Sequence, residues 1–403
     1  MPLSNMLDEE FSHLQQDNQN IYLDNAATTQ KPQSVINTIS QFYLSQNANV
    51  HRGSYAAANK ATSQYEAARK SVAEFINAPD DSHIVWTKGT TESINLVAYA
   101  WAEQHIKNDD VIVVLGSEHH ANFVPWQQLA LRKSAQFQVV NVKSDGSPDL
   151  THFKALMEQK PKLVAMQQCS NALGNIHPIT EMVSLAKQAG AVTLVDGAQA
   201  VAHLAVDVQQ IGCDFYVFSG HKMYGPTGIG VLYLSERIKA QMSPFHFGGE
   251  MIQHVSIEKT SFRPLPNLLE TGTPNISGVL GLKSAIEFMS SHEFKSVQEL
   301  ESNNYRYLVS KINELPNVLL HGNVENNIGV LSFTVEGEST SDVGTLLDEQ
   351  GISVRCGHHC AMPLMAALGI DGTVRVSLGI YNTKSDIDAF IRALQKTIAL
   401  LDI

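Results

Sequence analysis

Ala191-Val-Thr-Leu-Val195, followed directly by Asp196-Gly-Ala-Gln199, carries the clearest architectural signal in the sequence. A short apolar run without polar alternation is typical of a strand that is buried on both faces of a parallel sheet. In open α/β sheets, ligands bind beyond the carboxyl ends of such strands, and Asp196 stands at that end. The residues alone leave two interpretations of Asp196 open: a carboxylate that binds a ligand, or one that caps the next helix.

Further short β-type runs lie on both sides of this strand. They cover residues 84–87, 110–115, 162–167, 215–218 and 230–234. Helical patterns separate several of them, among them residues 92–102, 151–159 and 180–189. Strands that alternate with helices across short turns predict an α/β sheet covered by helices on both faces.

The pattern changes after about residue 280. Two long helical patterns precede three strand-like runs and a closing helix, at residues 279–291, 297–315, 329–335, 352–355, 374–377 and 384–401. This order predicts a second, smaller α+β domain whose boundary with the first lies in a helix. The sequence contains no internal repeat and no low-complexity linker.

Composition excludes several classes of function. The 403 residues, 43 % of them hydrophobic, suffice for two or three domains with a large core. A net charge of −12 without a long basic run argues against a nucleic-acid partner. Four cysteines exclude a disulfide scaffold and suit a reducing cytosol. With no long apolar run and no signal peptide in residues 1–16, we expect a soluble cytoplasmic protein without a membrane partner.

A lysine follows directly after one of the predicted strands. Ser219-Gly-His-Lys222 continues the run that ends at Phe218, and glycines and a proline crowd the residues that follow. Most lysines lie on protein surfaces, so one interpretation of Lys222 is an ordinary surface lysine. The functional alternative is a Schiff-base lysine, which attacks a carbonyl only as the neutral amine and therefore favours a partly buried site.

Two other turns carry ligand-binding chemistry. Lys88-Gly-Thr-Thr91-Glu92 lies between a strand and a helix, where N–H groups and hydroxyls could hold a phosphate, although threonine also caps helices routinely. Glu118-His-His-Ala-Asn122 follows the strand at 110–115, and an imidazole there could stack on an aromatic cofactor. A metal site is the competing interpretation, but neighbours on one strand point to opposite faces, which separates His119 from His120.

The run Arg355-Cys-Gly-His-His-Cys360-Ala-Met-Pro363 places cysteines and histidines close together. Structural zinc sites usually pair ligands from two separated clusters, and no second cluster is present, so we expect no metal here. An exposed cysteine flanked by imidazoles fits a reactive nucleophile better. Arg375 stands in an apolar strand, where a buried guanidinium needs a partner such as a substrate carboxylate.

Together these motifs resemble the class V, fold-type I pyridoxal-phosphate enzymes, and among them the cysteine desulfurase and selenocysteine lyase family. The resemblance covers nearly the whole chain. Besides the motifs above, it includes Tyr22-Leu-Asp-Asn-Ala-Ala-Thr28, Asn49-Val-His-Arg-Gly53, Gly272-Thr-Pro-Asn275 and Tyr381-Asn-Thr-Lys384. The short loop around Cys360 is similar to group II, the SufS/CsdA type, and the choice between those two subtypes stays open.

For the fold, the resemblance implies a large domain at residues 20–285, with a mostly parallel seven-stranded sheet flanked by helices. A smaller α+β domain, residues 1–19 and 286–403, would carry the Cys360 loop. The family further implies a homodimer in which each cofactor site is completed by the neighbouring subunit.

For the site, the resemblance implies roles residue by residue. Lys222 would bind pyridoxal phosphate as a Schiff base, and Asp196 would pair with the ring nitrogen and keep the ring an electron sink. Gln199 would bond the ring oxygen, and His119 would stack on the ring and help in proton transfer. The phosphate contacts would be Thr91, Ser219, His221 and, from the neighbouring subunit, Thr273. The substrate contacts would be Asn171, Arg375, His51 and Arg52.

The implied activity is that of a cysteine desulfurase. L-cysteine would give L-alanine, and Cys360 would take the sulfur as a persulfide for a SufE/CsdE-type acceptor, serving iron–sulfur clusters or other sulfur trafficking. Cys356 is the alternative thiol, or else a buried structural residue. The open alternatives are a lyase acting mainly on L-selenocysteine, a class V aminotransferase, a kynureninase-type lyase, and a non-catalytic sulfur carrier.

Overall fold

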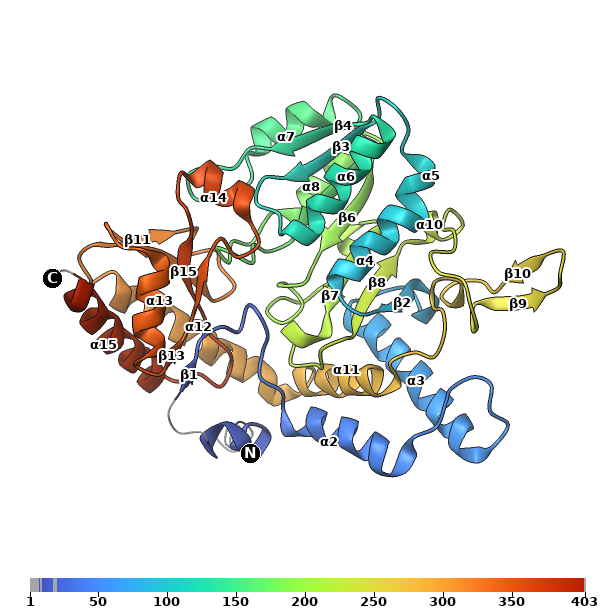
Figure 1. The fold of residues 1–403 in the computed structure, drawn as a ribbon, viewed down its shortest axis with the longest axis horizontal. Coiled ribbons are helices and arrows are strands. Elements are labelled where there is room, and N and C mark those ends of the chain that lie inside the picture. Colours follow the sequence, from blue (N-terminus) through green and yellow to red (C-terminus); the bar gives the residue numbers. More distant parts are fainter. Residues whose placement is uncertain (1–6, 8, 17–19, 402–403) are drawn as a thin grey trace.

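A sheet of seven strands forms the centre of the larger part of the molecule (Figure 1). The computed structural model describes residues 7, 9–16 and 20–401 of the chain. The strand order is β2-β8-β7-β6-β5-β3-β4, with β2 Ile84–Thr87, β8 Gly230–Leu234, β7 Phe215–Ser219, β6 Val192–Asp196, β5 Leu163–Gln167, β3 Val111–Leu115 and β4 Gln136–Val140. Only β8 runs antiparallel to its neighbours, so the predicted mostly parallel seven-stranded sheet is confirmed.

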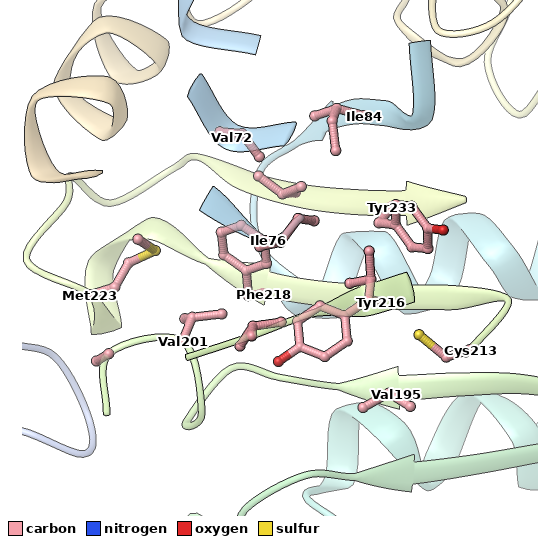
Figure 2. Packing of buried hydrophobic residues seen from close by; sticks show 14 of the residues in the cluster. Val72, Ile76, Ile84, Val195, Val201, Cys213, Tyr216, Phe218, Met223 and Tyr233 are labelled. Atoms are coloured by element: carbon pink, nitrogen blue, oxygen red, sulfur yellow. The ribbon is translucent and has the colours of Figure 1, made fainter. Parts of the chain in front are cut away.

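Both faces of this sheet are buried, which explains why its strands lack polar alternation. Along β6, Val195 belongs to one hydrophobic cluster and Leu194 to the other, on the opposite face. Figure 2 shows part of the first cluster, to which Val72 and Ile76 belong together with Tyr216 of β7 and Tyr233 of β8.

Helices supply the apolar side chains that cover the two faces. The first cluster draws on α3 Ala56–Phe75, α7 Leu150–Met157, α8 Ile179–Gln188, α9 Val208–Ile211 and α11 Ile276–Met289. The second draws on α4 Thr90–Val97, the turn Ala98–Ala102, α6 Val124–Lys133 and α10 Glu236–Lys239. Helix α2, Gln33–Gln41, packs on α11 below the sheet (Figure 1). A short helix, α5 Glu103–His105, completes this part.

The carboxyl-terminal third forms a second, antiparallel sheet. Its order is β11-β12-β15-β14, with β11 Val318–His321, β12 Val330–Val335, β15 Thr373–Ser377 and β14 Arg355–Gly357. The helices around it are α12 His292–Ile312, α13 Thr340–Asp348, α14 Met362–Leu368 and α15 Lys384–Leu401. Strands with helices in this order match the α+β arrangement expected after residue 280.

Some elements differ from the sequence expectation. The predicted strand at 352–355 is two short strands, because β13 Ile352–Ser353 pairs with β1 Ile21–Tyr22 while β14 joins β15. The hairpin of β9 Ile252–Val255 and β10 Thr260–Phe262 was not predicted, and it projects from the body (Figure 1).

The predicted division at residues 285 and 286 stays a prediction. Its amino-terminal piece, 1–19, lies partly outside the described residues, namely at 1–6, 8 and 17–19. Within the described part, the Phe11 ring lies against those of Phe288 and Tyr381. No helix in the described ranges is long and apolar enough to cross a membrane.

Candidate active site

A cavity of about 290 Å³ lies at the carboxyl ends of β5, β6 and β7, where the second sheet meets the first. Most of the site residues expected from the sequence line it: Thr91, His119, Asn171, Asp196, Gln199, Ser219, His221, Lys222, Cys360 and Arg375. Those from Thr91 to Lys222 stand at or near the ends of strands that the first sheet brings to one edge, whereas Cys360 comes from the loop before α14 and Arg375 from the second sheet.

Lys222 stands in a short turn, Gly220–Lys222, directly after β7. Burial, opposed by the charge of Asp196 and reinforced by that of Arg375, lowers the pKa of its ammonium to about 8. A substantial fraction of the amine is therefore neutral near pH 8, which is the form that attacks an aldehyde.

Asp196 lies at the end of β6 and is only 6 % exposed. Burial raises the pKa of its carboxyl. One oxygen accepts a hydrogen bond from the Ala198 N–H at 2.9 Å, so the carboxylate shapes the turn as well as lining the cavity. Gly197 permits this turn, because a Cβ there would overlap the Tyr216 side chain.

His119 presents a neutral imidazole to the cavity. Burial and the charge of Lys222 lower its pKa to about 3. Its Nδ1 accepts a hydrogen bond from the Ala121 N–H at 3.0 Å. The preceding Glu118 is fully buried and accepts from the Gln167 N–H at 2.6 Å and from Asn122 Nδ2 at 2.7 Å. Glu118 therefore anchors the turn that carries His119.

Hydroxyls and N–H groups gather where β7 meets the first turn of α4. The Thr90 N–H donates to Ser219 Oγ at 2.8 Å, and the two hydroxyls lie 2.7 Å apart. Thr91 and His221 line the cavity beside them. Burial, with the charges of Lys222 and Lys31, lowers the pKa of His221 to about 4.

Two arginines share one carboxylate that the sequence analysis did not single out. Asp24 Oδ1 accepts from Arg375 at 2.8 Å, and Asp24 Oδ2 accepts from Arg355 at 2.8 Å. Arg375, 2 % exposed, also donates to the Asn171 carbonyl at 2.7 Å, while its Nε has no partner. The guanidinium is thus held in place with one donor unused.

Cys360 is exposed and lines the same cavity. His359 and Cys360 both have left-handed backbone conformations, with φ values of 51° and 56°, which cost non-glycine residues about 1–2 kcal/mol each. The loop is tied down by Asn171 Nδ2, which donates to the His359 carbonyl at 2.6 Å. The buried His359 ring lies 2.8 Å from Thr373 Oγ1.

Cys356 faces away from the cavity. Its sulfur fills the space beside Gly344 of α13, where a Cβ would overlap it. Burial raises the pKa of its thiol to about 11, which makes it a poor nucleophile at neutral pH. This geometry supports the structural interpretation of Cys356.

Three expected residues do not reach the cavity within one chain. His51 Nε2 lies 2.8 Å from Glu66, and Arg52 pairs with Glu250 at 2.9 Å. Thr273 is exposed and lines a different hollow. The substrate contacts expected of His51 and Arg52 stay predictions, as does the contact of Thr273 with the phosphate of the neighbouring subunit.

Other residues of the cavity wall were missed by sequence reasoning. Gln167 and Cys169 line it from the end of β5, where only their place after a buried strand could have pointed to them. Within the described ranges, no three His, Cys, Asp or Glu residues lie together as metal ligands.

The fold and this cavity together define a class of protein. The chain belongs to the class V aminotransferase family, whose model matches residues 21–390. Within that family, its relatives are cysteine desulfurases. It is 43 % identical to a probable cysteine desulfurase of Vibrio cholerae serotype O1, and 44 % identical to a cysteine desulfurase of Escherichia coli O157:H7. Each match spans 94 % of both chains.

Solved structures give the same result. The chain is similar to the apo cysteine desulfurase of Thermococcus onnurineus NA1, with a TM-score of 0.91, 38 % identity and coverage of 94 % and 95 % of the two chains. It is also similar to the Escherichia coli cysteine desulfurase CsdA in its S-sulfonic acid form, with a TM-score of 0.89, 41 % identity and 96 % coverage of each. The chain is therefore a cysteine desulfurase of class V, and this family depends on pyridoxal phosphate.

The residues of the cavity fit that cofactor. A buried carboxyl with a raised pKa, Asp196, suits a protonated ring nitrogen, because a nearby cation would stabilise its charged form. Lys222 offers a neutral amine for the aldehyde. The phosphate would find donors at the amino end of α4 and in the hydroxyls of Thr91 and Ser219.

Proposed function

We propose that this enzyme passes the sulfur of L-cysteine to its own Cys360, leaving L-alanine and a persulfide on that residue. The observation that carries the proposal is the shared cavity. It brings a lysine with a lowered pKa, a buried arginine, and the exposed Cys360 to one volume of about 290 Å³.

Arg375 binds the substrate carboxylate. Its guanidinium lines the cavity and is oriented by the Asn171 carbonyl and by Asp24, so it presents a fixed positive charge to a carboxylate. Such charge-assisted contacts are directional, so they place the amino acid with its side chain in one orientation.

Lys222 moves the proton. Bound pyridoxal phosphate supplies an electron sink for the pair of electrons left when the Cα–H bond breaks. The neutral Nζ of Lys222 accepts that proton, because its pKa near 8 lets it both take up and return protons at physiological pH. Burial lowers the pKa of His119 to about 3, so its imidazole is neutral in the resting site, and its help in proton transfer stays a prediction.

Cys360 takes the sulfur. Its thiolate Sγ forms a bond to the substrate sulfur while the Cβ–S bond breaks, and the electron pair of that bond stays on carbon and is protonated. L-cysteine and the enzyme thiol thus become L-alanine and the enzyme persulfide, with no external oxidant or reductant.

The finer assignments belong to the same proposal. A short, strained loop restrains Cys360, so the persulfide needs an acceptor protein that comes to it, of the SufE/CsdE type, for iron–sulfur cluster assembly or other sulfur trafficking in the cytoplasm. Thr273, His51 and Arg52 lie outside the cavity of one chain, which supports a homodimer in which they complete the neighbour's site.

Mass spectrometry after treatment with L-cysteine tests this proposal. We expect one added sulfur on the peptide that contains Cys360, none in Cys360→Ser, and a normal adduct in the matched control Cys356→Ala. If Cys356→Ala loses the adduct and Cys360→Ser keeps it, the assignment of the nucleophile is wrong.

A further inference from the structure

The reactive loop is held at two of its backbone groups, the Cys360 carbonyl and the Met362 N–H, by one residue from the turn after β3. His120 opens the turn His120–Asn122 that follows β3, while Cys360 belongs to the loop before α14. The His120 N–H donates to the Cys360 carbonyl at 2.8 Å. The His120 ring nitrogen Nε2 accepts from the Met362 N–H at 3.2 Å.

These contacts cross between the two parts of the molecule. Helix α14, which starts at Met362, lies between the second sheet and the end of the first (Figure 1). Its Leu364 and Met365 pack on Ala172 and Leu173. That apolar packing fixes the helix as a body. The two left-handed residues before this helix, His359 and Cys360, are held by hydrogen bonds instead.

The role of the His120 ring is separate from that of its neighbour. His119 lines the cavity and His120 does not. Because Nε2 accepts a backbone N–H, the ring must be neutral with its proton on Nδ1. The His358 ring lies next to it, with centroids 5.8 Å apart, and His358 Nδ1 accepts from the Cys360 N–H at 3.2 Å.

We propose that His120 is a positioning residue for sulfur transfer: the lone pair on its Nε2 holds the Met362 N–H and thereby keeps Cys360 Sγ directed into the cavity. The inference rests on the proposed function, since it presumes Cys360 as the sulfur acceptor. This positioning role requires a hydrogen-bond acceptor where His120 Nε2 lies. It requires neither a catalytic base nor a positive charge there.

Two substitutions of His120 distinguish the effect of losing the hydrogen-bond acceptor from the effect of losing the imidazole ring. His120→Gln keeps an acceptor oxygen at similar reach, and His120→Leu removes it at similar size. Both keep the backbone contact to the Cys360 carbonyl. We expect His120→Leu to lower kcat for alanine formation from L-cysteine roughly tenfold, the factor for one lost hydrogen bond, with KM unchanged because Arg375 still binds the substrate. His120→Gln should restore most of the rate.

L-selenocysteine provides the internal control. The C–Se bond is weaker than the C–S bond, and selenium can leave as Se(0) while the electron pair of that bond stays on Cβ and is protonated, so alanine formation from L-selenocysteine depends less on Cys360 and should stay within about twofold of the wild type in both variants. Should His120→Leu fail to fold, His120→Asn against His120→Gln makes the same comparison, since asparagine is one methylene too short to reach Met362.

Three results would overturn the inference. They are a wild-type rate with L-cysteine in the leucine variant, an equal fall with both substrates, and a glutamine variant as slow as the leucine variant. Failure of the proposed function would look different, because the wild-type enzyme would then carry no persulfide on Cys360, whatever stands at position 120.

Discussion

Burial beside Arg375 makes Lys222 a weaker base than a lysine in water, and under the proposed function this sets how the apoprotein takes up its cofactor. With a pKa lowered from 10.5 to about 8, the amine is mostly charged below pH 8 and mostly neutral above it. Only the neutral amine attacks an aldehyde, so the rate of cofactor capture at Lys222 should rise with pH and level off above about pH 8.

Peptide mass spectrometry can follow this capture if pyridoxal phosphate is trapped with cyanoborohydride at several pH values. Exposed lysines provide the comparison within each sample, and their labelling should keep rising towards pH 10. A Lys222 profile parallel to theirs would show that the site does not shift its pKa, and Lys222→Ala should remove the labelled peptide altogether.

Single functional residues were predictable from the sequence where a short motif itself contains the reactive side chain. Lys222, Asp196 and Cys360 each follow a strand or open a loop that the sequence makes visible. Asp24 was not predictable, because its partners Arg355 and Arg375 lie more than 300 positions along the chain. Glu118 was missed because its partners are a backbone N–H and a neighbouring amide, which leave no pattern.

At the scale of elements, strands β14 and β15 place Arg355 opposite Arg375, and the segment after β1 brings Asp24 to both. We expect Asp24→Asn to lower the free energy of unfolding by about 3 kcal/mol, because it leaves the buried Arg375 without its carboxylate. The KM for L-cysteine should rise as the guanidinium loses its orientation.

The control for this change is Arg355→Gln, which breaks the other half of the pair. Arg355 has 48 % of its side chain exposed, so this variant should cost less than about 1 kcal/mol in urea denaturation. Equal losses in the two variants would contradict the view that burial of Arg375 makes the difference.

Packing between β14 and α13 gives a second prediction at this scale. Cys356→Ala removes a sulfur that fills the space beside Gly344 and should cost about 1 kcal/mol of stability without changing turnover. Gly344→Ala adds a methyl group into the same space and should cost about 1–3 kcal/mol. Thermal denaturation and a desulfuration assay check both, and a Cys356→Ala enzyme without activity would reverse our view of this thiol.

Elements were predictable where burial left a clear pattern. The runs at 162–167 and 191–195 became β5 and β6, because strands covered on both faces must be apolar throughout. Strand β11 and the hairpin of β9 and β10 were missed, since they are partly or largely exposed and carry no continuous apolar run. The strand at 352–355 was predicted as one because the sequence does not show that its two ends pair with different sheets.

At the scale of the whole molecule, the predicted role of Thr273 depends on a second copy of the chain, and we propose the same for His51 and Arg52. Exchange of subunits between two defective enzymes tests this. Lys222→Ala lacks the reactive lysine, and Thr273→Asp places a negative charge against the neighbour's phosphate. In a mixed dimer, one site has both defects and the other has neither.

Each variant alone should be inactive, whereas co-expression should restore about a quarter of the wild-type activity, since random pairing gives half mixed dimers with one intact site each. Activity that does not return on mixing, or an active monomer in light scattering, would contradict the shared site. No sequence pattern within one chain can show such a site, which explains why these residues were predicted only through the family resemblance.

The claim on which the account depends is that Cys360 accepts the sulfur, and the alanine released by Cys360→Ser from two substrates tests it most directly. Without a nucleophile to take it, sulfur does not leave L-cysteine with the electron pair kept on Cβ, whereas the weaker C–Se bond of L-selenocysteine lets selenium leave as Se(0) while that electron pair stays on Cβ and is protonated to give alanine. We predict that Cys360→Ser loses at least roughly a hundredfold of its rate with L-cysteine and keeps much of its rate with L-selenocysteine. Equal losses with both substrates, or an undiminished rate with L-cysteine, would contradict the account.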